Sequence, residues 1–339
     1  MTLHTLKSLH FYQYSEPFKE TITTPKVTLK EREVLVIGLE TEEEQYFGEC
    51  NAFRTAWYDA VTIEDVVSRL KDWFQNVKGT TIETFEDAQK LADALNDCPS
   101  ARSTVIMALY QMFYPLKAFA VDYGATVSGM TQTKLKQLKQ TAPKRVKLKW
   151  SADVLDDIRA VQGLPFSSSI ALDANESLTF QDMTLLKQLD HDAILYLEEP
   201  FIDFQNDLMD EASAYAPLAI DEKATSEEDM MHLVKQYPID TVILKPFRLG
   251  GIDNLYTVMK QLQQHGIHVV VGGMYEFGLS RYFTALLARL GDFPGDVTPD
   301  GYYFEQDFVP QSGILKGGSI YFEPPEVDAD RLTLIDSIF

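Results

Sequence analysis

Five ionisable residues recur at a nearly constant interval in the middle of this chain. They are Lys149, Asp173, Glu198, Asp221 and Lys245, separated by 24, 25, 23 and 24 residues (173−149, 198−173, 221−198, 245−221). Each follows a short apolar run, and a β-strand with its returning helix takes a little over about 20 residues. The spacing therefore predicts five consecutive strands of a (β/α) barrel. Their charged residues would meet at the C-terminal mouth, where barrel active sites are built.

The segments on either side of this repeat have other patterns. Short alternating runs such as EREVLVIGLE indicate antiparallel strands near the start of the chain, and IEDVVSRLKDWFQNV has helical spacing. We expect residues 1–120 to form an α+β domain and residues 121–310 to form the barrel. An irregular tail over residues 311–339 follows the barrel.

Composition and charge exclude several classes of protein. The formal net charge of −21 argues against binding to nucleic acid or to an acidic membrane surface. The only two cysteines, Cys50 and Cys98, cannot build a disulfide framework or a cysteine metal cluster. The N-terminus lacks a signal pattern, and the longest apolar runs are too short to span a bilayer. We expect a cytoplasmic protein, and the sequence leaves homo-oligomerisation open.

Three of the recurring residues are carboxylates: Asp173, Glu198 and Asp221. Hard oxygen ligands on adjacent strand ends suit Mg²⁺, which prefers octahedral oxygen coordination, and Mn²⁺ could substitute for it. A bound cation would also offset the repulsion between the carboxylates. Three unrelated solvated acids at loop starts are the alternative. Their common phase with two lysines favours the metal site.

The two lysines of the repeat, Lys149 and Lys245, flank the carboxylates, and Lys147 lies just before Lys149. Lys147 and Lys149 are two residues apart, so both side chains should point into the barrel. Burial and neighbouring positive charge are expected to lower the pKa of such a lysine and let it act as a base. Lysines of a surface edge strand, or a Schiff-base role for Lys149 or Lys245, are the alternatives. Apolar Val146, Leu148 and Trp150 on the opposite face favour a helix-packed barrel strand over a surface edge strand. The Schiff-base role does not account for the carboxylates.

These motifs together resemble the enolase superfamily, within it the muconate-lactonising subgroup. They are KLK at 147–149, DAN at 173–175, EEP at 198–200, DE at 221–222, Lys245 and GGM at 272–274, in that order. The similarity is greatest to o-succinylbenzoate synthases and N-succinylamino acid racemases. The resemblance implies a modified (β/α)₇β barrel, covered by an α+β capping domain built from the N-terminal part and the C-terminal tail. It also implies Mg²⁺ on the three carboxylates, with Lys149 and Lys245 on opposite faces of a small carboxylate substrate.

Further residues are expected around that substrate. We expect substrate contacts from Lys147, Asn175, Thr126, Gly273, Met274 and Arg248. A loop cap at Asn175, a barrel kink at the glycines and a helix cap at Arg248 are the structural alternatives. Glu276 is expected to pair with Lys245 or to be a solvated loop acid. The loops near Thr21–Pro25 and Asn51–Trp57 are expected to close over the site.

The resemblance leaves three functions to weigh. The first is dehydration of 2-succinyl-6-hydroxy-2,4-cyclohexadiene-1-carboxylate to 2-succinylbenzoate in menaquinone biosynthesis, with Lys149 as acid and base and Lys245 as a cation. The second is racemisation of N-succinylamino acids, in which both lysines carry protons. The third is a non-catalytic barrel that serves as a binding module, against which the intact lysine and carboxylate set argues.

Overall fold

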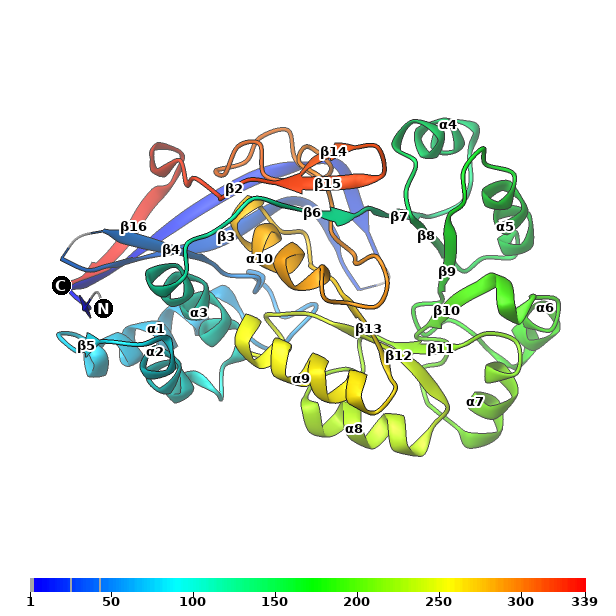
Figure 1. Ribbon diagram of the computed structural model, residues 1–339, viewed down its shortest axis with the longest axis horizontal. Helices are drawn as coiled ribbons and strands as arrows, with labels where there is room; N and C mark the ends of the chain where they lie inside the picture. Colours follow the sequence, from blue (N-terminus) through cyan, green and yellow to red (C-terminus); the bar gives the residue numbers. More distant parts are fainter. Residues whose placement is uncertain (1–2, 25, 43) are drawn as a thin grey trace.

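The computed structural model describes residues 3–24, 26–42 and 44–339. At its centre is a parallel sheet, for which the described residues give seven strands in the order β13-β12-β11-β10-β9-β8-β7. Neighbours in the sheet are neighbours in the chain, so the sheet curls into a barrel wall (Figure 1). The strands are β7 (Gly124–Val127), β8 (Arg145–Lys149), β9 (Ser169–Asp173), β10 (Ile194–Glu198), β11 (Leu218–Ile220), β12 (Ile239–Leu244) and β13 (His268–Val271).

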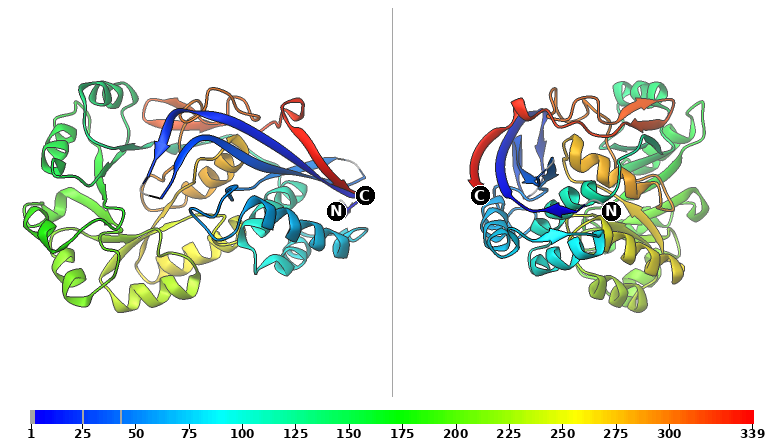
Figure 2. Two further views of the ribbon diagram at one scale, coloured as in Figure 1. Left: turned by 180° about the vertical axis from the view of Figure 1, so that it is seen from behind. Right: turned by 60° about the vertical axis from the view of Figure 1, so that its left-hand side comes forward.

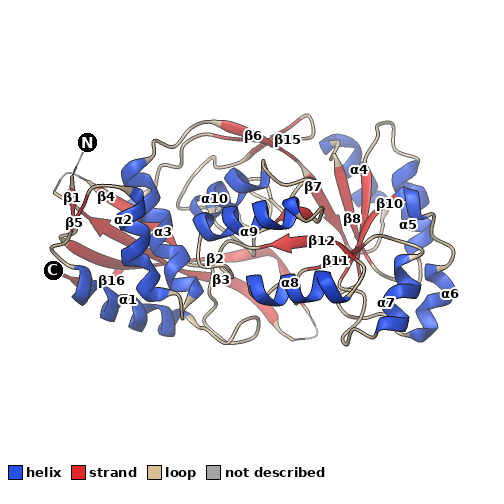
Figure 3. Cartoon of the chain, turned by 60° about the horizontal axis from the view of Figure 1, so that its bottom comes forward, coloured by secondary structure: helices blue, strands red, loops and turns tan. Residues whose placement is uncertain are grey.

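A helix follows each strand of this sheet, and α4 to α9 lie outside it (Figure 3). Their apolar residues recur every three to four positions, as in α9, where Leu255, Val258, Met259 and Leu262 are buried. The helices are α4 (Gln132–Thr141), α5 (Val154–Gln162), α6 (Met183–Leu186), α7 (Asn206–Ser213), α8 (Glu227–Gln236), α9 (Ile252–Gln264) and α10 (Gly278–Ala288).

The interior of the barrel has its own small apolar cluster. It contains Ala171, Tyr196, Ala219, Ile243 and Val270, one from each of five adjacent strands and all fully buried. The residues next to them in the strands, such as Leu172 and Leu197, belong to the larger cluster that packs against the helices. This alternation fixes which residues point inward, because side chains alternate across a strand.

The segment 292–297 takes the place of an eighth strand. The backbone amides of Asp292 and Asp296 donate to the carbonyls of Val269 (2.8 Å) and Val271 (3.1 Å) in β13. On its other side, the Gly295 carbonyl lies so close to Gly124 of β7 that a Cβ there would be 2.8 Å from it. The segment therefore closes the ring between the last and first strands, which confirms the modified (β/α)₇β barrel.

The N-terminal part and the tail form the cap. One antiparallel sheet has the order β16-β2-β3-β4, so the C-terminal strand β16 pairs with β2 (Figure 2). A second sheet pairs β6, just ahead of the barrel, with β15 and β14 of the tail. The capping domain expected from both ends of the chain is therefore confirmed, while the limits at residues 120 and 310 stay a prediction. Its elements are β1 (His4–Thr5), β2 (Ser8–Thr23), β3 (Thr28–Glu40), β4 (Gln45–Glu49), α1 (Ile63–Val77), β5 (Thr81–Ile82), α2 (Phe85–Ala92), α3 (Pro99–Phe113), β6 (Phe119–Asp122), β14 (Ile314–Lys316), β15 (Ser319–Phe322) and β16 (Thr333–Ile338).

Buried polar contacts fasten the cap to the barrel. The Arg102 guanidinium of α3 is fully buried and binds the Asp253 carboxylate at the start of α9 at 2.9 Å. The Glu49 carboxylate at the end of β4 accepts the backbone amides of Phe277 and Ser280, both at 2.8 Å, at the N-terminus of α10. Among the described residues, no helix has the length and apolarity to cross a membrane.

Candidate active site

The recurring charged residues lie at the barrel mouth because of their register. Asp173, Glu198, Asp221 and Lys245 each stand two residues beyond an interior core residue, namely Ala171, Tyr196, Ala219 and Ile243. Two residues along a strand return the side chain to the same face. Lys149 pairs in register with Asp173, and Asp173 with Glu198. The strand register therefore brings these side chains together at one end of the barrel.

Lys147 lies at the centre of the carboxylates. Its Nζ donates to both oxygens of Glu198, at 3.0 and 3.2 Å, and to Oδ2 of Asp296 at 2.7 Å. Oδ2 of Asp173 is 3.8 Å away. The Lys147 side chain is almost fully buried. Its ammonium is thus a resident positive charge that three carboxylates share.

Lys149 is held more loosely at the rim. Its Nζ is 2.5 Å from Oδ2 of Asp173 and 3.3 Å from Oδ1 of Asn175, and the Lys149 side chain is 35% exposed. Asn175 has a left-handed φ of 47°, and its backbone amide donates to Oδ1 of Asp173 at 3.0 Å. Asn175 therefore caps the Asp173 carboxylate, and its amide oxygen faces Lys149.

Lys245 is enclosed on the other side of the mouth. Its Nζ contacts both oxygens of Asp221, at 2.5 and 2.7 Å, and the hydroxyl of Tyr58 at 3.0 Å. Arg248 donates to Oδ1 of the same Asp221 at 2.8 Å and also to the Tyr58 hydroxyl. The Arg248 guanidinium, expected on the substrate, thus has Asp221 and Tyr58 as its partners in this structure.

Contrary to expectation, burial and neighbouring positive charge do not lower the pKa of Lys147 or of Lys245. Burial acts to lower the pKa of Lys147, but the charges of Asp296, Glu198 and Asp173 outweigh it and raise that pKa well above its ordinary value. Burial likewise acts to lower the pKa of Lys245, but Asp221, Tyr58 and Glu222 together outweigh it, so this pKa is raised as well. Carboxylates, not other cations, are the nearest neighbours of both ammonium groups, so both stay protonated at neutral pH.

The pKa values of the Glu198 and Asp221 carboxylates are shifted in opposite directions. Burial, together with the negative charges of Asp173 and Asp221, raises the pKa of Glu198 well above its ordinary value despite Lys147. Burial also acts to raise the pKa of Asp221, but Lys245 and Arg248 outweigh it and lower that pKa to about 2. Burial therefore dominates at Glu198, whereas the two neighbouring cations dominate at Asp221.

The donor chemistry of this cluster fits a divalent cation. Asp173, Glu198 and Asp221 are buried hard-oxygen donors on three adjacent strands, as Mg²⁺ requires. Among the described residues, however, no three acidic, histidine or cysteine side chains already surround one point. The carboxylates bind lysine and arginine groups instead, so a cation would have to take over contacts that Lys147, Lys149 and Lys245 now make.

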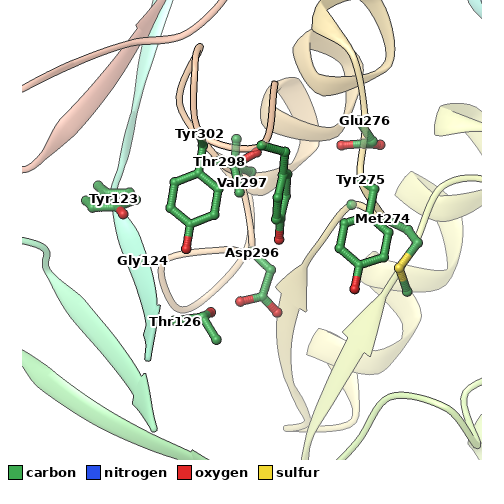
Figure 4. Close-up of a pocket in the computed structure, with 12 residues that line it drawn as sticks. Tyr123, Gly124, Thr126, Met274, Tyr275, Glu276, Asp296, Val297, Thr298 and Tyr302 are labelled. Atoms are coloured by element: carbon green, nitrogen blue, oxygen red, sulfur yellow. The ribbon is translucent and has the colours of Figure 1, made fainter. Parts of the chain in front are cut away.

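A cavity of about 70 Å³ opens next to this cluster. Thr126, Gly273 and Met274 line it together with Asp296, Tyr275 and Tyr302 (Figure 4). The backbone amide of Gly273 donates to the Asp296 carbonyl at 3.2 Å, and a Cβ on Gly273 would be 1.9 Å from Oε2 of Glu276. A side chain at position 273 would therefore displace the Glu276 carboxylate. Three of the expected substrate contacts share this one cavity.

The expected pair between Glu276 and Lys245 is wrong. The Glu276 carboxylate accepts hydrogen bonds from the hydroxyls of Ser280 (2.7 Å) and Thr284 (2.6 Å) and from the Asn51 amide (3.4 Å). The solvated alternative is wrong as well, because Glu276 is only 5% exposed. The hydroxyls of the following helix thus hold its carboxylate, and Glu276 is one of the residues that line the cavity.

Two segments of the cap reach the barrel mouth. Tyr58, directly after the predicted loop Asn51–Trp57, contacts Lys245. On the β2–β3 hairpin, the Phe18 ring lies 5.3 Å from the ring of Tyr275, beside the cavity. The other predicted loop, Thr21–Pro25, follows on this hairpin (Figure 2), and its Pro25 lies outside the described residues.

Sequence reasoning did not identify Asp296 or Tyr58 as site residues. The spacing could have indicated Asp296, because this residue stands 24 residues after Gly272 (296−272). The two residues form a parallel bridge. Their spacing is the same step as between the other strand ends. Tyr58 comes from a loop of the cap, and no periodicity in the sequence indicates that it meets Lys245.

Comparisons with known proteins identify the family. The pattern of the family described as enolase C-terminal domain-like matches residues 125–324, which is more than half of the chain. The o-succinylbenzoate synthase of Bacillus subtilis is 25% identical over 332 residues, covering 90% of this chain and 87% of that protein. The N-succinylamino acid racemase of Thermus thermophilus is 31% identical over 185 residues, covering 52% of this chain and 49% of that protein.

Solved structures agree on the fold. A member of the enolase superfamily from Listeria innocua superposes with a TM-score of 0.82 at 22% identity, covering 99% of this chain and 98% of that one. A dipeptide epimerase from Enterococcus faecalis, complexed with Mg and a dipeptide, gives 0.77 at 18% identity and covers 97% and 99%. With its modified barrel, its cap and the matched family pattern, this chain belongs to the enolase superfamily.

Proposed function

We propose that this protein is an o-succinylbenzoate synthase, a carbon–oxygen lyase that depends on Mg²⁺. It would dehydrate 2-succinyl-6-hydroxy-2,4-cyclohexadiene-1-carboxylate to 2-succinylbenzoate, a step of menaquinone biosynthesis. The similarity to o-succinylbenzoate synthases along most of the chain supports this substrate. An acidic cytoplasmic enzyme without nucleic-acid or membrane partners is consistent with its net charge of −21.

The main support for this proposal is that Lys149 and Lys245 have different environments. Lys245 is buried and paired with both oxygens of Asp221, so it stays an ammonium. Lys149 is one-third exposed and touches one oxygen of Asp173. A dehydration needs one group that moves a proton and one fixed cation. A racemisation needs proton transfer on both faces, which the enclosure of Lys245 disfavours.

In the proposed reaction, Lys149 removes the α-proton of the substrate and then gives a proton to the departing hydroxide. The carbon–oxygen bond breaks, and the product leaves with one molecule of water. Lys245 remains protonated and stabilises the enediolate from the opposite face. Asp173, Glu198 and Asp221 would hold Mg²⁺, which supplies positive charge for the substrate carboxylate.

Several residues would position the substrate between the lysines. Thr126, Gly273 and Met274 line the cavity beside the cluster and are suited to the part of the substrate away from the reacting carbon. Asn175 would orient Asp173, to which it binds, and Lys147 would supply positive charge for the substrate. Arg248 would keep Asp221 on Lys245, since it contacts the same carboxylate.

N-succinylamino acid racemisation is the second candidate, favoured by the similarity to the Thermus thermophilus racemase. Purified protein with Mg²⁺ should be given each substrate in turn. We expect loss of the cyclohexadiene absorbance to be the faster reaction, and racemisation, followed by optical rotation, to be slower. Racemisation faster than dehydration would make the racemase the better description. Inactivity on both substrates, with tight binding of either, would favour a binding module.

A further inference from the structure

The carboxylate of Asp296 joins two buried cations. Its Oδ1 is 2.5 Å from the Arg145 guanidinium, and its Oδ2 is 2.7 Å from Nζ of Lys147. The Asp296 side chain is 18% exposed, and both partners are almost fully buried. The carboxylate of Asp296 lies beside Thr126 in the cavity (Figure 4). It therefore lies between the floor of the barrel and the carboxylates at its mouth.

Asp296 is held in place without any help from Lys147. Its backbone amide donates to the Val271 carbonyl at 3.1 Å, and its own carbonyl accepts the Gly273 amide at 3.2 Å. Arg145, which holds the other carboxylate oxygen, is itself fixed by the Tyr196 hydroxyl at 2.8 Å. The position of Oδ2 is thus set by the closed barrel, and the long Lys147 side chain adjusts to it.

Asp296 and Glu198 hold the same ammonium. Lys147 donates to both oxygens of Glu198 as well as to Asp296. Arg145, Lys147, Asp296 and Glu198 together form a connected cluster of two cations and two carboxyl groups. If Glu198 turns to a divalent cation, Lys147 would lose its main carboxylate partner, and a buried unpaired ammonium is costly. Asp296 is the carboxylate that remains on it.

We infer that Asp296 is a positioning residue that retains Lys147 and so frees Glu198 for the divalent cation. The inference rests on the metal site of the proposed function. It adds that the affinity for the metal is set in part by a carboxylate that does not bind the metal. Without Asp296, Lys147 would depend on Glu198 and Asp173, which are both proposed metal ligands, and would compete with the cation for them.

The test is metal binding, without any substrate. Mg²⁺ is titrated calorimetrically into metal-free wild-type protein and into Asp296→Asn. We expect Asp296→Asn to weaken Mg²⁺ binding by about tenfold or more, as partners of metal ligands typically do. The matched control is Asp292→Asn, because Asp292 is in the same segment but its carboxylate accepts the Val269 amide at 2.8 Å and contacts no lysine. The control should change the Mg²⁺ affinity by less than about twofold.

A double mutant separates positioning from general damage. In a Lys147→Met background, Asp296→Asn should have a clearly smaller effect on Mg²⁺ affinity, because the ammonium it retains is gone. An equal effect in both backgrounds, or an equal loss in Asp292→Asn, would overturn the inference. If Asp296→Asn does not fold, Lys147→Met decides alone: Mg²⁺ binding at least as tight as in the wild type supports the inference, and weaker binding overturns it. Wild-type protein that binds no Mg²⁺ would refute the metal mechanism itself.

Discussion

Substituting Lys149 and Lys245 separately tests their proposed roles, Lys149 as the acid and base and Lys245 as a fixed cation. Lys149→Ala removes the group that moves the proton. Its side chain is 35% exposed, and its ion pair with Asp173 is open to solvent, so the loss should cost about 1 kcal/mol of stability or less. General acid–base catalysis contributes about 10²- to 10⁴-fold. Dehydration should fall by that factor, which is about 3–5 kcal/mol in the activation free energy.

Lys245→Arg keeps a cation beside Asp221 and removes a proton carrier. The Lys245 side chain is 4% exposed, so the larger guanidinium must fit a packed site, at a cost of about 1–3 kcal/mol. We expect dehydration to survive, reduced by about five- to hundredfold. Racemisation should stop, because one face of the substrate has lost its base.

Both variants are assayed by the rate of dehydration and by exchange of the substrate α-proton with deuterium, followed by NMR. Lys245→Arg should still exchange the proton of one N-succinylamino acid enantiomer through Lys149. Unchanged dehydration in Lys149→Ala would show that Lys149 is not the acid and base. Equal inactivation by both substitutions would mean that Lys245 also carries protons, and the two-base racemase geometry would then describe the site better.

Three further predictions concern the metal, the cap and pH. EDTA should abolish activity and Mg²⁺ or Mn²⁺ should restore it, while Asp173→Asn or Glu198→Gln weakens metal binding with little change in the circular dichroism spectrum; full activity in chelator would contradict the metal mechanism. Tyr58→Phe should alter the ratio of kcat/KM between the two substrates more than the Mg²⁺ affinity, because Tyr58 contacts Lys245 from the cap; a change in Mg²⁺ affinity alone would contradict this. Burial opposes ionisation of Asp221, but Lys245 and Arg248 lower its pKa to about 2, so its ionised form stabilises the metal-free fold above its unfolded pKa of about 4. That contribution, about 2 kcal/mol, should be lost as the pH falls from about 4 to 2, and urea unfolding of Asp221→Asn should show a smaller loss over this range.

The barrel and the charged residues at its strand ends could be predicted from the sequence. A strand and its returning helix need a nearly fixed number of residues. A repeat of 23 to 25 residues therefore predicts that each charged residue lies at the same point of successive strands. The sequence alone shows that four of these residues follow the apolar strand residues at the same offset, namely Asp173, Glu198, Asp221 and Lys245. Alternation along the strand likewise places Lys147 and Lys149 on one face.

Which charged groups pair with one another could not be predicted from the sequence, because it depends on the folded arrangement. Lys147 meets Asp296, 149 residues away, and Lys245 meets Tyr58 of the cap, 187 residues away. Such contacts depend on how the barrel closes and where the cap lies, and no local pattern encodes either. The same holds for the pKa values of the lysines: the sequence indicated nearby cations, but folding surrounded Lys147 and Lys245 with carboxylates. Electrostatics depends on distances in space, and the spacing along the chain fixes only some of them.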